Sequence, residues 1–313
     1  MQRNKNQIVF KTPDVLTPPN VRYYLKEVSP LFGMEGKTVP NVVFNAEGLN
    51  NAGLLGQLLI YKFMEYSIKK RCFQKPSFSI KEETFSEFKK TGFQKLVLAL
   101  ANNKKQEFDS LKYEEEDGIF IAPINLAIYE NSDCQDLYAP QIRGYYNDEK
   151  VTFIVTLCMS EIAANYSAHA ADDTNSILVA RGNHDTFEIA CADNGKGILT
   201  TLRPYLNRKL SHCEVLEQAM KQGVTSKKGT NHMGYGLWLV NEMVTRLKGE
   251  LYVFSEKAYY VNRQGREKKG LCDYWRGTIT YVRLQLNNKK AIDAIYAVFM
   301  KRYNRYKIKR HNG

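Results

Sequence analysis

The clearest pattern in the chain is a long apolar run, residues 151–159, that continues into a polar stripe. Neither Gly nor Pro interrupts the segment from Val151 to Asn165, so it predicts one mostly buried helix. Glu161 and Asn165 are four residues apart and share one face of this helix, and His169 continues that face one turn later. Because a buried unpaired charge costs on the order of several kcal/mol, we expect these side chains to be paired, to bind a metal or to act in catalysis. A solvated helix face is the alternative.

A second pattern is a hairpin that ends in two glycines. Residues 176–180 and 186–192 predict its two strands. Asp193 follows the second strand, and Gly195 and Gly197 allow a positive φ or a close approach of the backbone to a ligand. On its own, this D-x-G-x-G pattern also fits an ordinary turn.

A third pattern is a glycine turn that leads into a helix. Gly234 and Gly236 flank Tyr235 and precede residues 237–244, whose apolar spacing is helical. The backbone N–H groups and the dipole at a helix N-terminus favour an anion. A phosphate group is therefore expected near this turn.

The segment before this turn, residues 223–229, is polar, bounded by glycines and doubly basic. Lys227 and Lys228 supply its charge. A mobile lid over a triphosphate requires these properties. A solvated surface loop is the alternative.

Together and in this order, the patterns resemble the Bergerat ATP-binding fold of the GHKL superfamily, the histidine kinase-like ATPases. This superfamily includes DNA gyrase, mismatch-repair ATPases, heat-shock chaperones, sensor histidine kinases and anti-sigma serine kinases. Five matches carry the resemblance: residues 160–165 with His169 (its N-box), residues 193–197 (first glycine box), Gly234-x-Gly236 (second glycine box), Thr225-Ser226-Lys227 (the mismatch-repair lid) and Gly277-Thr278 (the Gly-Thr of a late strand beneath the adenine).

The resemblance covers about residues 140–288 and implies an α/β (α+β) fold class. The implied C-terminal domain has a layered mixed sheet, with helices on one face and an ATP lid. Residues 249–255 and 278–284 are expected to supply two of its strands. The expected domains are an N-terminal α/β domain (1–135), a histidine kinase-like ATP-binding domain (136–290) and a basic C-terminal helix or tail (291–313).

The resemblance also implies roles for single residues. Asn165 would ligate Mg²⁺ through its side-chain oxygen, a hard donor for a hard cation. Asp193 would accept a hydrogen bond from the adenine amino group, and Thr278 would help to fix the adenine. His169 would support the site from behind Asn165, or only pack. The full expected ATP-binding set is Asn165, Asp193, Gly195, Gly197, Thr225, Ser226, Lys227, Lys228, Gly234, Tyr235, Gly236, Leu237 and Thr278.

Glu161 decides which chemistry is expected. The histidine-kinase branch usually has Asn at this position, whereas the hydrolysing ATPases and the anti-sigma serine kinases have Glu. A carboxylate can orient and deprotonate water or a hydroxyl group. The resemblance therefore implies a Mg²⁺-dependent ATPase with Glu161 as catalytic base, in which lid closure regulates a partner. An anti-sigma-like Ser/Thr protein kinase and a non-hydrolysing nucleotide-sensing adaptor remain as alternatives.

The N-terminal part carries less chemistry. Residues 39–44 predict a strand, residues 51–64 and 85–101 predict helices, and a further strand is expected near residues 118–122. This β-then-α order resembles a small STAS-like regulatory domain. An addition packed on the ATPase domain is the alternative.

Composition fits a cytoplasmic protein of about two domains. Apolar residues make up 43% of the 313 residues, which is enough for a core in each domain. No apolar run approaches the ~20 residues that span a bilayer, so no membrane contact is expected. The six cysteines form no C-x-x-C motif and are expected to be reduced core residues.

Charge suggests further partners. The net charge is +12, and residues 301–313 contain six Lys or Arg and no acid, with tyrosines between them. Such a tail can contact nucleic acid through phosphates and base stacking, or it can simply be solvated. The chain is also similar to stand-alone bacterial GHKL proteins of regulation or phage (antiviral) defence. That likeness implies a protein partner encoded nearby and a homodimer formed on ATP.

Overall fold

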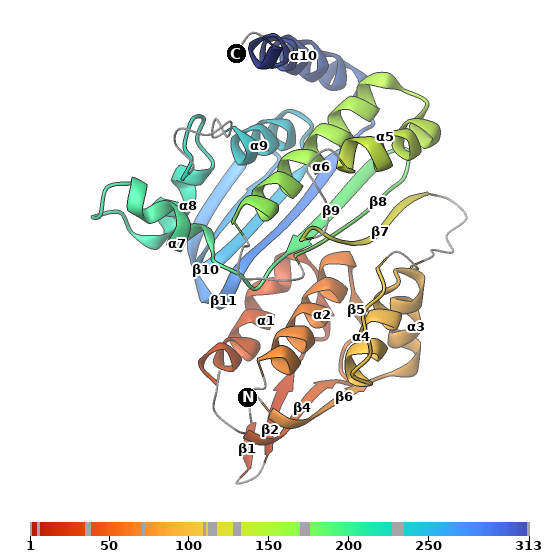
Figure 1. The fold of residues 1–313 in the computed structure, drawn as a ribbon, viewed down its shortest axis with the longest axis vertical. Helices are drawn as coiled ribbons and strands as arrows, with labels where there is room; N and C mark the ends of the chain where they lie inside the picture. Colours follow the sequence, from red (N-terminus) through yellow and green to blue (C-terminus); the bar gives the residue numbers. More distant parts are fainter. Residues whose placement is uncertain are drawn as a thin grey trace.

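The computed structural model describes residues 2–4, 7–34, 39–70, 73–108, 111, 118–127, 133–169, 176–226 and 235–311. Over these ranges the chain stacks in four layers, a sheet, a layer of helices, a second sheet and a second layer of helices (Figure 1). The N-terminal residues form the first two layers, called the N-terminal unit below. The arrangement is mixed α/β, with parallel and antiparallel strand pairs.

The outer sheet of the N-terminal unit has the order β1-β2-β4-β6 within the described residues. Its strands are β1 (Gln2–Asn4), β2 (Gln7–Lys11), β4 (Val39–Ala46) and β6 (Phe73–Ile80). The pairs β2–β4 and β4–β6 are parallel, whereas β1–β2 is antiparallel. Parallel neighbours need a crossover, which helices provide.

The helices of this unit are α1 (Val21–Val28), α2 (Leu54–Lys69), α3 (Glu82–Lys90) and α4 (Phe93–Ala101). The predictions for residues 39–44 and 51–64 are confirmed as β4 and α2. The single helix predicted over 85–101 is wrong, because Gly92 has φ +77° and divides it into α3 and α4. Short elements complete the unit: β3 (Val15–Leu16), β5 (Asn51–Ala52) and the 3₁₀ turns η1 (Pro18–Asn20) and η2 (Ser29–Gly33).

The second sheet has the order β10-β11-β9-β8-β7. Its strands are β7 (Ile119–Asn125), β8 (Ile177–Gly182), β9 (Thr186–Ala192), β10 (Glu250–Arg263) and β11 (Arg266–Gln285). The expectation of a mixed sheet here is wrong, since each described pairing is antiparallel. Tight turns join β8 to β9 and β10 to β11, and such turns require antiparallel neighbours.

β7 comes from the segment that was expected to belong to the N-terminal domain. It pairs with β8, with Ile121 opposite Ala180, and forms an outer strand of the second sheet. This sheet therefore begins before the expected boundary at residue 135. The two paired segments are far apart in sequence, so no local pattern marks their pairing.

The remaining helices lie on one side of the second sheet, where α10 packs over α6 and α9 (Figure 1). These are α5 (Asp133–Tyr146), α6 (Glu149–His169), α7 (Ile198–Leu202), α8 (His212–Ala219), α9 (Gly236–Arg246) and α10 (Lys289–His311), with the turn η3 (Arg203–Tyr205). The predicted helices over 151–165 and 237–244 are confirmed as parts of α6 and α9. None of the helices in the described ranges combines the length and the apolar character that a bilayer crossing requires.

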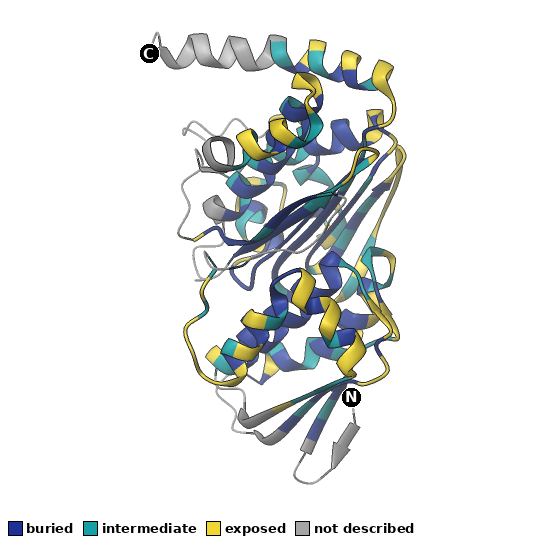
Figure 2. Cartoon of the chain, turned by 90° about the vertical axis from the view of Figure 1, so that its right-hand side faces the viewer, coloured by how far each residue is buried: buried dark blue, intermediate teal, exposed yellow. Residues whose placement is uncertain are grey.

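The opposite face of the same sheet packs on the N-terminal unit. Alternate residues of β9 show the division: Ile189 and Cys191 join the core beneath α6, whereas Ala190 and Ala192 join the core shared with α2. Figure 2 colours the elements on both sides of this sheet mostly as buried. The N-terminal unit therefore has its own sheet but completes its core against the second sheet.

The β10–β11 hairpin is longer than the predicted strands over 249–255 and 278–284, and it folds back on itself. Its strand register shifts next to Glu256, which has φ +54°. Beyond this bend the hairpin returns toward its own start, where the N–H of Gln264 donates to the carbonyl of Gly249 at 2.9 Å. Arg263 and Glu250 form an ion pair at 3.3 Å at the same place.

Candidate functional site

Glu161 and Asn165 of α6 lie against the first residue of α9. A Cβ on Gly236 would lie 2.9 Å from Asn165 Nδ2 and 3.0 Å from Glu161 Oε2. Only a residue without a Cβ leaves both side chains in place. The fold therefore brings the polar stripe of α6 next to the glycine turn that begins α9.

Asn165 is held with its side-chain oxygen available. Its Nδ2 donates to the backbone carbonyl of Glu161, one turn earlier, at 2.8 Å. Within the described part of the chain, Oδ1 has no hydrogen-bond partner. An amide oxygen of this kind is a ligand that Mg²⁺ accepts.

Glu161 is half-buried, and within the described ranges its carboxylate makes no hydrogen bond or ion pair. Burial raises the pKa of Glu161 above its ordinary value. Cys158, on the same helix, is fully buried, and burial raises the pKa of its thiol, so it adds no charge. A carboxylate without partners and with a raised pKa is suited to accept a proton near neutral pH.

The described residues contain no group of three His, Cys, Asp or Glu side chains arranged to hold a metal ion. Mg²⁺ does not need such a group when it binds with a nucleotide, because one or two protein ligands suffice when phosphates and waters complete its shell. Asn165 and Glu161 could therefore hold Mg²⁺ if phosphate groups and waters supply its other ligands.

Asp193 is buried at the end of β9 and is fixed on both carboxylate oxygens. Oδ1 accepts from the N–H of Gly195 at 2.7 Å, and Oδ2 accepts from the N–H of Thr278 at 3.1 Å. The N–H of Asp193 donates to the carbonyl of Thr278 at 3.0 Å. A carboxylate is an acceptor with about four positions, and the backbone fixes the orientation of this one.

Gly197, near Asp193, serves close packing rather than an unusual backbone angle. Gly197 has φ −76°, and neither it nor Gly195 is among the described residues with positive φ, so the positive φ considered for them is wrong. A Cβ on Gly197 would instead lie 2.7 Å from Ser255 Oγ and 2.5 Å from Glu256 Cγ. Gly197 is needed because β10 passes directly against it.

Two residues that the sequence analysis missed hold the start of α7. Ser255 Oγ accepts from the N–H of Ile198 at 2.8 Å. Glu256 accepts from the N–H of Thr200 at 2.8 Å and from its hydroxyl at 2.7 Å. A polar pair directly after the apolar run 251–254 is the signal that could have pointed to them.

Asp193 and Asn165 lie on the same side of the sheet. In β11, Thr280 and Val282 face the helices, while Ile279 and Tyr281 face the N-terminal unit, so Thr278 also faces the helices. Tyr166, next to Asn165, was also missed by the sequence analysis. Its hydroxyl lies 3.0 Å from the carbonyl of Cys191 and 3.1 Å from Thr280 Oγ1. Tyr166 therefore fixes α6 over the strands that carry Asp193 and Thr278.

The remaining predicted residues are described only in part. Thr225 and Ser226 are half-buried after α8, and Tyr235 and Leu237 are half-buried on either side of Gly236. The side chain of Tyr235, which precedes α9, makes no capping hydrogen bond to that helix. Lys227, Lys228 and Gly234 lie outside the described residues, as does the side chain of His169, the last residue of α6.

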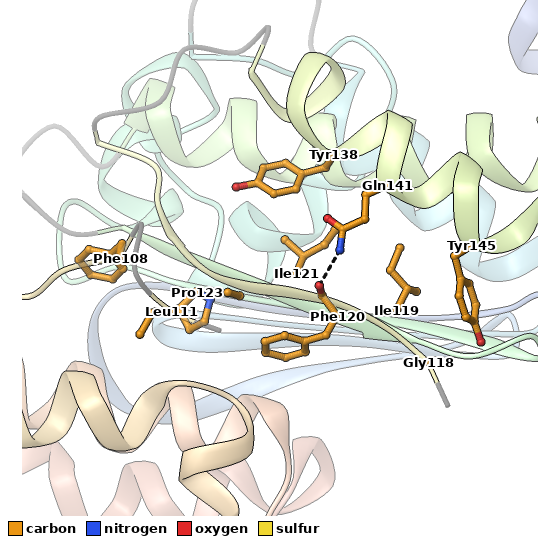
Figure 3. Close-up of a pocket in the computed structure, with 11 residues that line it drawn as sticks. Phe108, Leu111, Gly118, Ile119, Phe120, Ile121, Pro123, Tyr138, Gln141 and Tyr145 are labelled. Atoms are coloured by element: carbon orange, nitrogen blue, oxygen red, sulfur yellow. Dashed lines mark hydrogen bonds between the residues drawn. The ribbon is translucent and has the colours of Figure 1, made fainter. Parts of the chain in front are cut away.

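A separate cavity of about 620 Å³ lies between α5 and β7. Figure 3 shows Tyr138, Gln141 and Tyr145 of α5 above the strand, where Gln141 Nε2 donates to the carbonyl of Phe120 at 3.1 Å. The described lining of this cavity includes none of the motif residues. It is therefore not part of the candidate site on α6 and α9.

No protein-family model matches the chain, and no curated protein matches it either. The site is therefore assigned from its own residues.

Proposed function

We propose that this protein binds ATP with Mg²⁺ in a Bergerat-type site of the GHKL kind and hydrolyses the nucleotide. The observation that supports this most is the contact of Gly236 with both Asn165 and Glu161. It places an amide oxygen, a carboxylate and a helix N-terminus at one point, on the side of the sheet that also carries Asp193 and Thr278.

Asp193 and Thr278 bind the adenine in this proposal. The backbone N–H groups of Gly195 and Thr278 fix the orientation of the Asp193 carboxylate, which would accept a hydrogen bond from the adenine amino group. Thr278 lies beside it in β11, with its hydroxyl 3.2 Å from Ser255 Oγ. A fixed, buried acceptor selects a base that presents a donor.

Asn165 and the start of α9 bind the phosphate end. Asn165 would hold Mg²⁺ through Oδ1, and the bound ion supplies positive charge that neutralises the phosphate oxygens. The N–H groups and the dipole at the start of α9 attract the phosphates. Thr225 and Ser226 lie at the beginning of the segment that was expected to close over the phosphates.

Glu161 acts as general base. Its carboxylate orients a water molecule and takes its proton while the water oxygen bonds to the γ-phosphorus. The bond from that phosphorus to the oxygen bridging it to the β-phosphate breaks, which yields ADP and inorganic phosphate. A Ser or Thr hydroxyl of another protein in place of water gives a protein kinase, which is the second candidate.

Phosphate release from the purified chain with Mg²⁺ and ATP tests this proposal. Glu161→Gln should lower turnover by about 10²- to 10⁴-fold, the usual contribution of a general base. Glu242→Gln is the matched control, because it neutralises a carboxylate on α9 whose described ion pair is with Arg246. Wild-type turnover in Glu161→Gln would remove Glu161 as the base. Transfer of phosphate only to an added protein would favour the kinase.

A further inference from the structure

Trp275 is fully buried where β11 passes between the N-terminal unit and the candidate site. Its indole Nε1–H donates to the backbone carbonyl of Asp193 at 3.0 Å. Its ring also meets the ring of Phe32 in η2, edge to face, with the ring centres 5.3 Å apart. One side chain therefore contacts both the N-terminal unit and the residue proposed to bind the adenine.

The N-terminal unit also holds the residue before Trp275. Ser29 Oγ accepts from the N–H of Tyr274 at 3.1 Å. The ring of Phe32 lies edge to face against Tyr274 as well, at 5.7 Å between ring centres, and packs against Tyr66 of α2 at 4.9 Å. The turn η2 thus fixes two consecutive residues of β11.

Tyr274 and Trp275 directly precede the part of β11 that contacts Asp193. Gly277 follows Trp275 by two residues and packs against the Asp193 carboxylate, and the N–H of Thr278 donates to Asp193 Oδ2. Because the interior is close-packed, a displacement of residues 274–275 should also shift Gly277 and Thr278. The position of η2 therefore affects the position of the carboxylate.

We propose that Phe32 and Trp275 are a positioning pair, through which the N-terminal unit sets the affinity of the site for ATP. This inference rests on the proposed function, because the affinity concerned is that of the ATP site. Both residues act through Asp193. A partner that moves η2 changes nucleotide affinity, and by linkage ATP changes the affinity for that partner by the same factor.

The alternative is that Trp275 and Phe32 only fill the core. In that case their truncation lowers stability and leaves the site unchanged. Phe85 provides a matched control: it is also a half-buried Phe of the N-terminal unit, and its described ring contacts are with Phe78 and Phe88. Phe85→Leu removes the same atoms as Phe32→Leu, away from η2.

Two measurements on the full chain test the inference. The first is amide hydrogen exchange at Gly195 and Thr278 without nucleotide, since both N–H groups bond to Asp193. The second is the affinity for Mg·ATP by calorimetry. Phe32→Leu should accelerate both exchange rates and weaken ATP binding by about 2- to 10-fold, the usual range for one aromatic pair. Phe85→Leu should do neither.

Wild-type exchange and affinity in Phe32→Leu would overturn the inference, as would equal changes in Phe85→Leu. If the wild-type chain does not bind ATP, the proposed function fails, and the exchange rates alone decide whether Phe32 positions Asp193. Phe32→Met, whose flexible side chain can adapt to the space that the ring leaves, replaces Phe32→Leu if the latter does not fold.

Discussion

Gly277 lies directly against the carboxylate of Asp193, in a backbone conformation with φ +95°. A Cβ at this position would overlap Asp193 Oδ1, and the next residue, Thr278, donates its N–H to Oδ2. Glycine is therefore required twice here, once for the backbone angle and once for space. The orientation of Asp193 depends on both.

Gly277→Ala should destabilise the protein by more than backbone strain alone. A left-handed conformation costs a residue with a Cβ about 1–2 kcal/mol, and the overlap with Asp193 adds to this. Gly223→Ala is the control, because Gly223 has φ +80° but no atom of the described residues within 4 Å of the added Cβ. Urea denaturation measures both free energies of unfolding. An equal decrease in the free energy of unfolding in both variants would show that Gly277 has room for a Cβ.

Gly236→Ala should keep the fold and weaken Mg·ATP binding by at least about 10-fold. The added Cβ must displace the side chains of Asn165 and Glu161. Displacing a residue that ligates or orients a metal typically lowers the binding affinity by about an order of magnitude or more. Gly144→Ala, on α5 and with open space around it, should leave binding unchanged. Calorimetric titration compares the three proteins. Wild-type affinity in Gly236→Ala would separate α9 from the phosphate site.

Glu161→Gln should stabilise the fold more at about pH 7 than at about pH 4. Burial raises the pKa of Glu161 above 4.5, so the folded state holds its proton more tightly than the unfolded state. The free energy of unfolding therefore falls as the pH rises from 4.5 through the raised pKa, and glutamine removes this decrease. Urea denaturation of both proteins across this pH range measures the difference. A difference that is independent of pH would show that Glu161 titrates normally.

Asn262→Ala should lower the free energy of unfolding by about 2–3 kcal/mol. Asn262 is buried, and its Nδ2 donates to Asn241 Oδ1 at 2.7 Å and to Thr245 Oγ1 at 2.8 Å, while its Oδ1 accepts from the N–H of Gly265 at 2.9 Å. These bonds tie the hairpin turn to α9. The exposed Asn102→Ala, which removes one surface bond, should change the urea midpoint little.

Local periodicity was enough to predict much of the second sheet and its helices. The apolar run of α6, the hairpin of β8 and β9, and the spacing of α9 each depend on neighbouring residues, so a pattern in the sequence reports them. The same reasoning correctly placed Glu161 and Asn165 on one face of a helix. Their contact with Gly236 supports the expectation that the polar stripe of α6 and the glycine turn before α9 form one site.

What the sequence did not reveal depends on contacts between distant segments. The pairing of β7 with β8 and the bend at Glu256 follow from packing that no local pattern encodes. Tyr166 and Trp275 look like ordinary core aromatics in the sequence, yet each forms a hydrogen bond beside Asp193 or its strand. The glycine pattern 193–197 was recognised, but the close approach of β10 is visible only in the fold.

The binding of ATP through Asp193 is tested most directly by titrating Mg·ATP and Mg·GTP into the wild-type chain and into Asn165→Ala. The carboxylate of Asp193 should favour the amino group of adenine and reject the carbonyl oxygen of guanine, so ATP should bind at least about 10-fold more tightly than GTP. Asn165→Ala should lose the Mg²⁺-dependent part of that affinity. Absence of ATP binding to the wild-type chain, or equal affinity for ATP and GTP, would contradict the assignment.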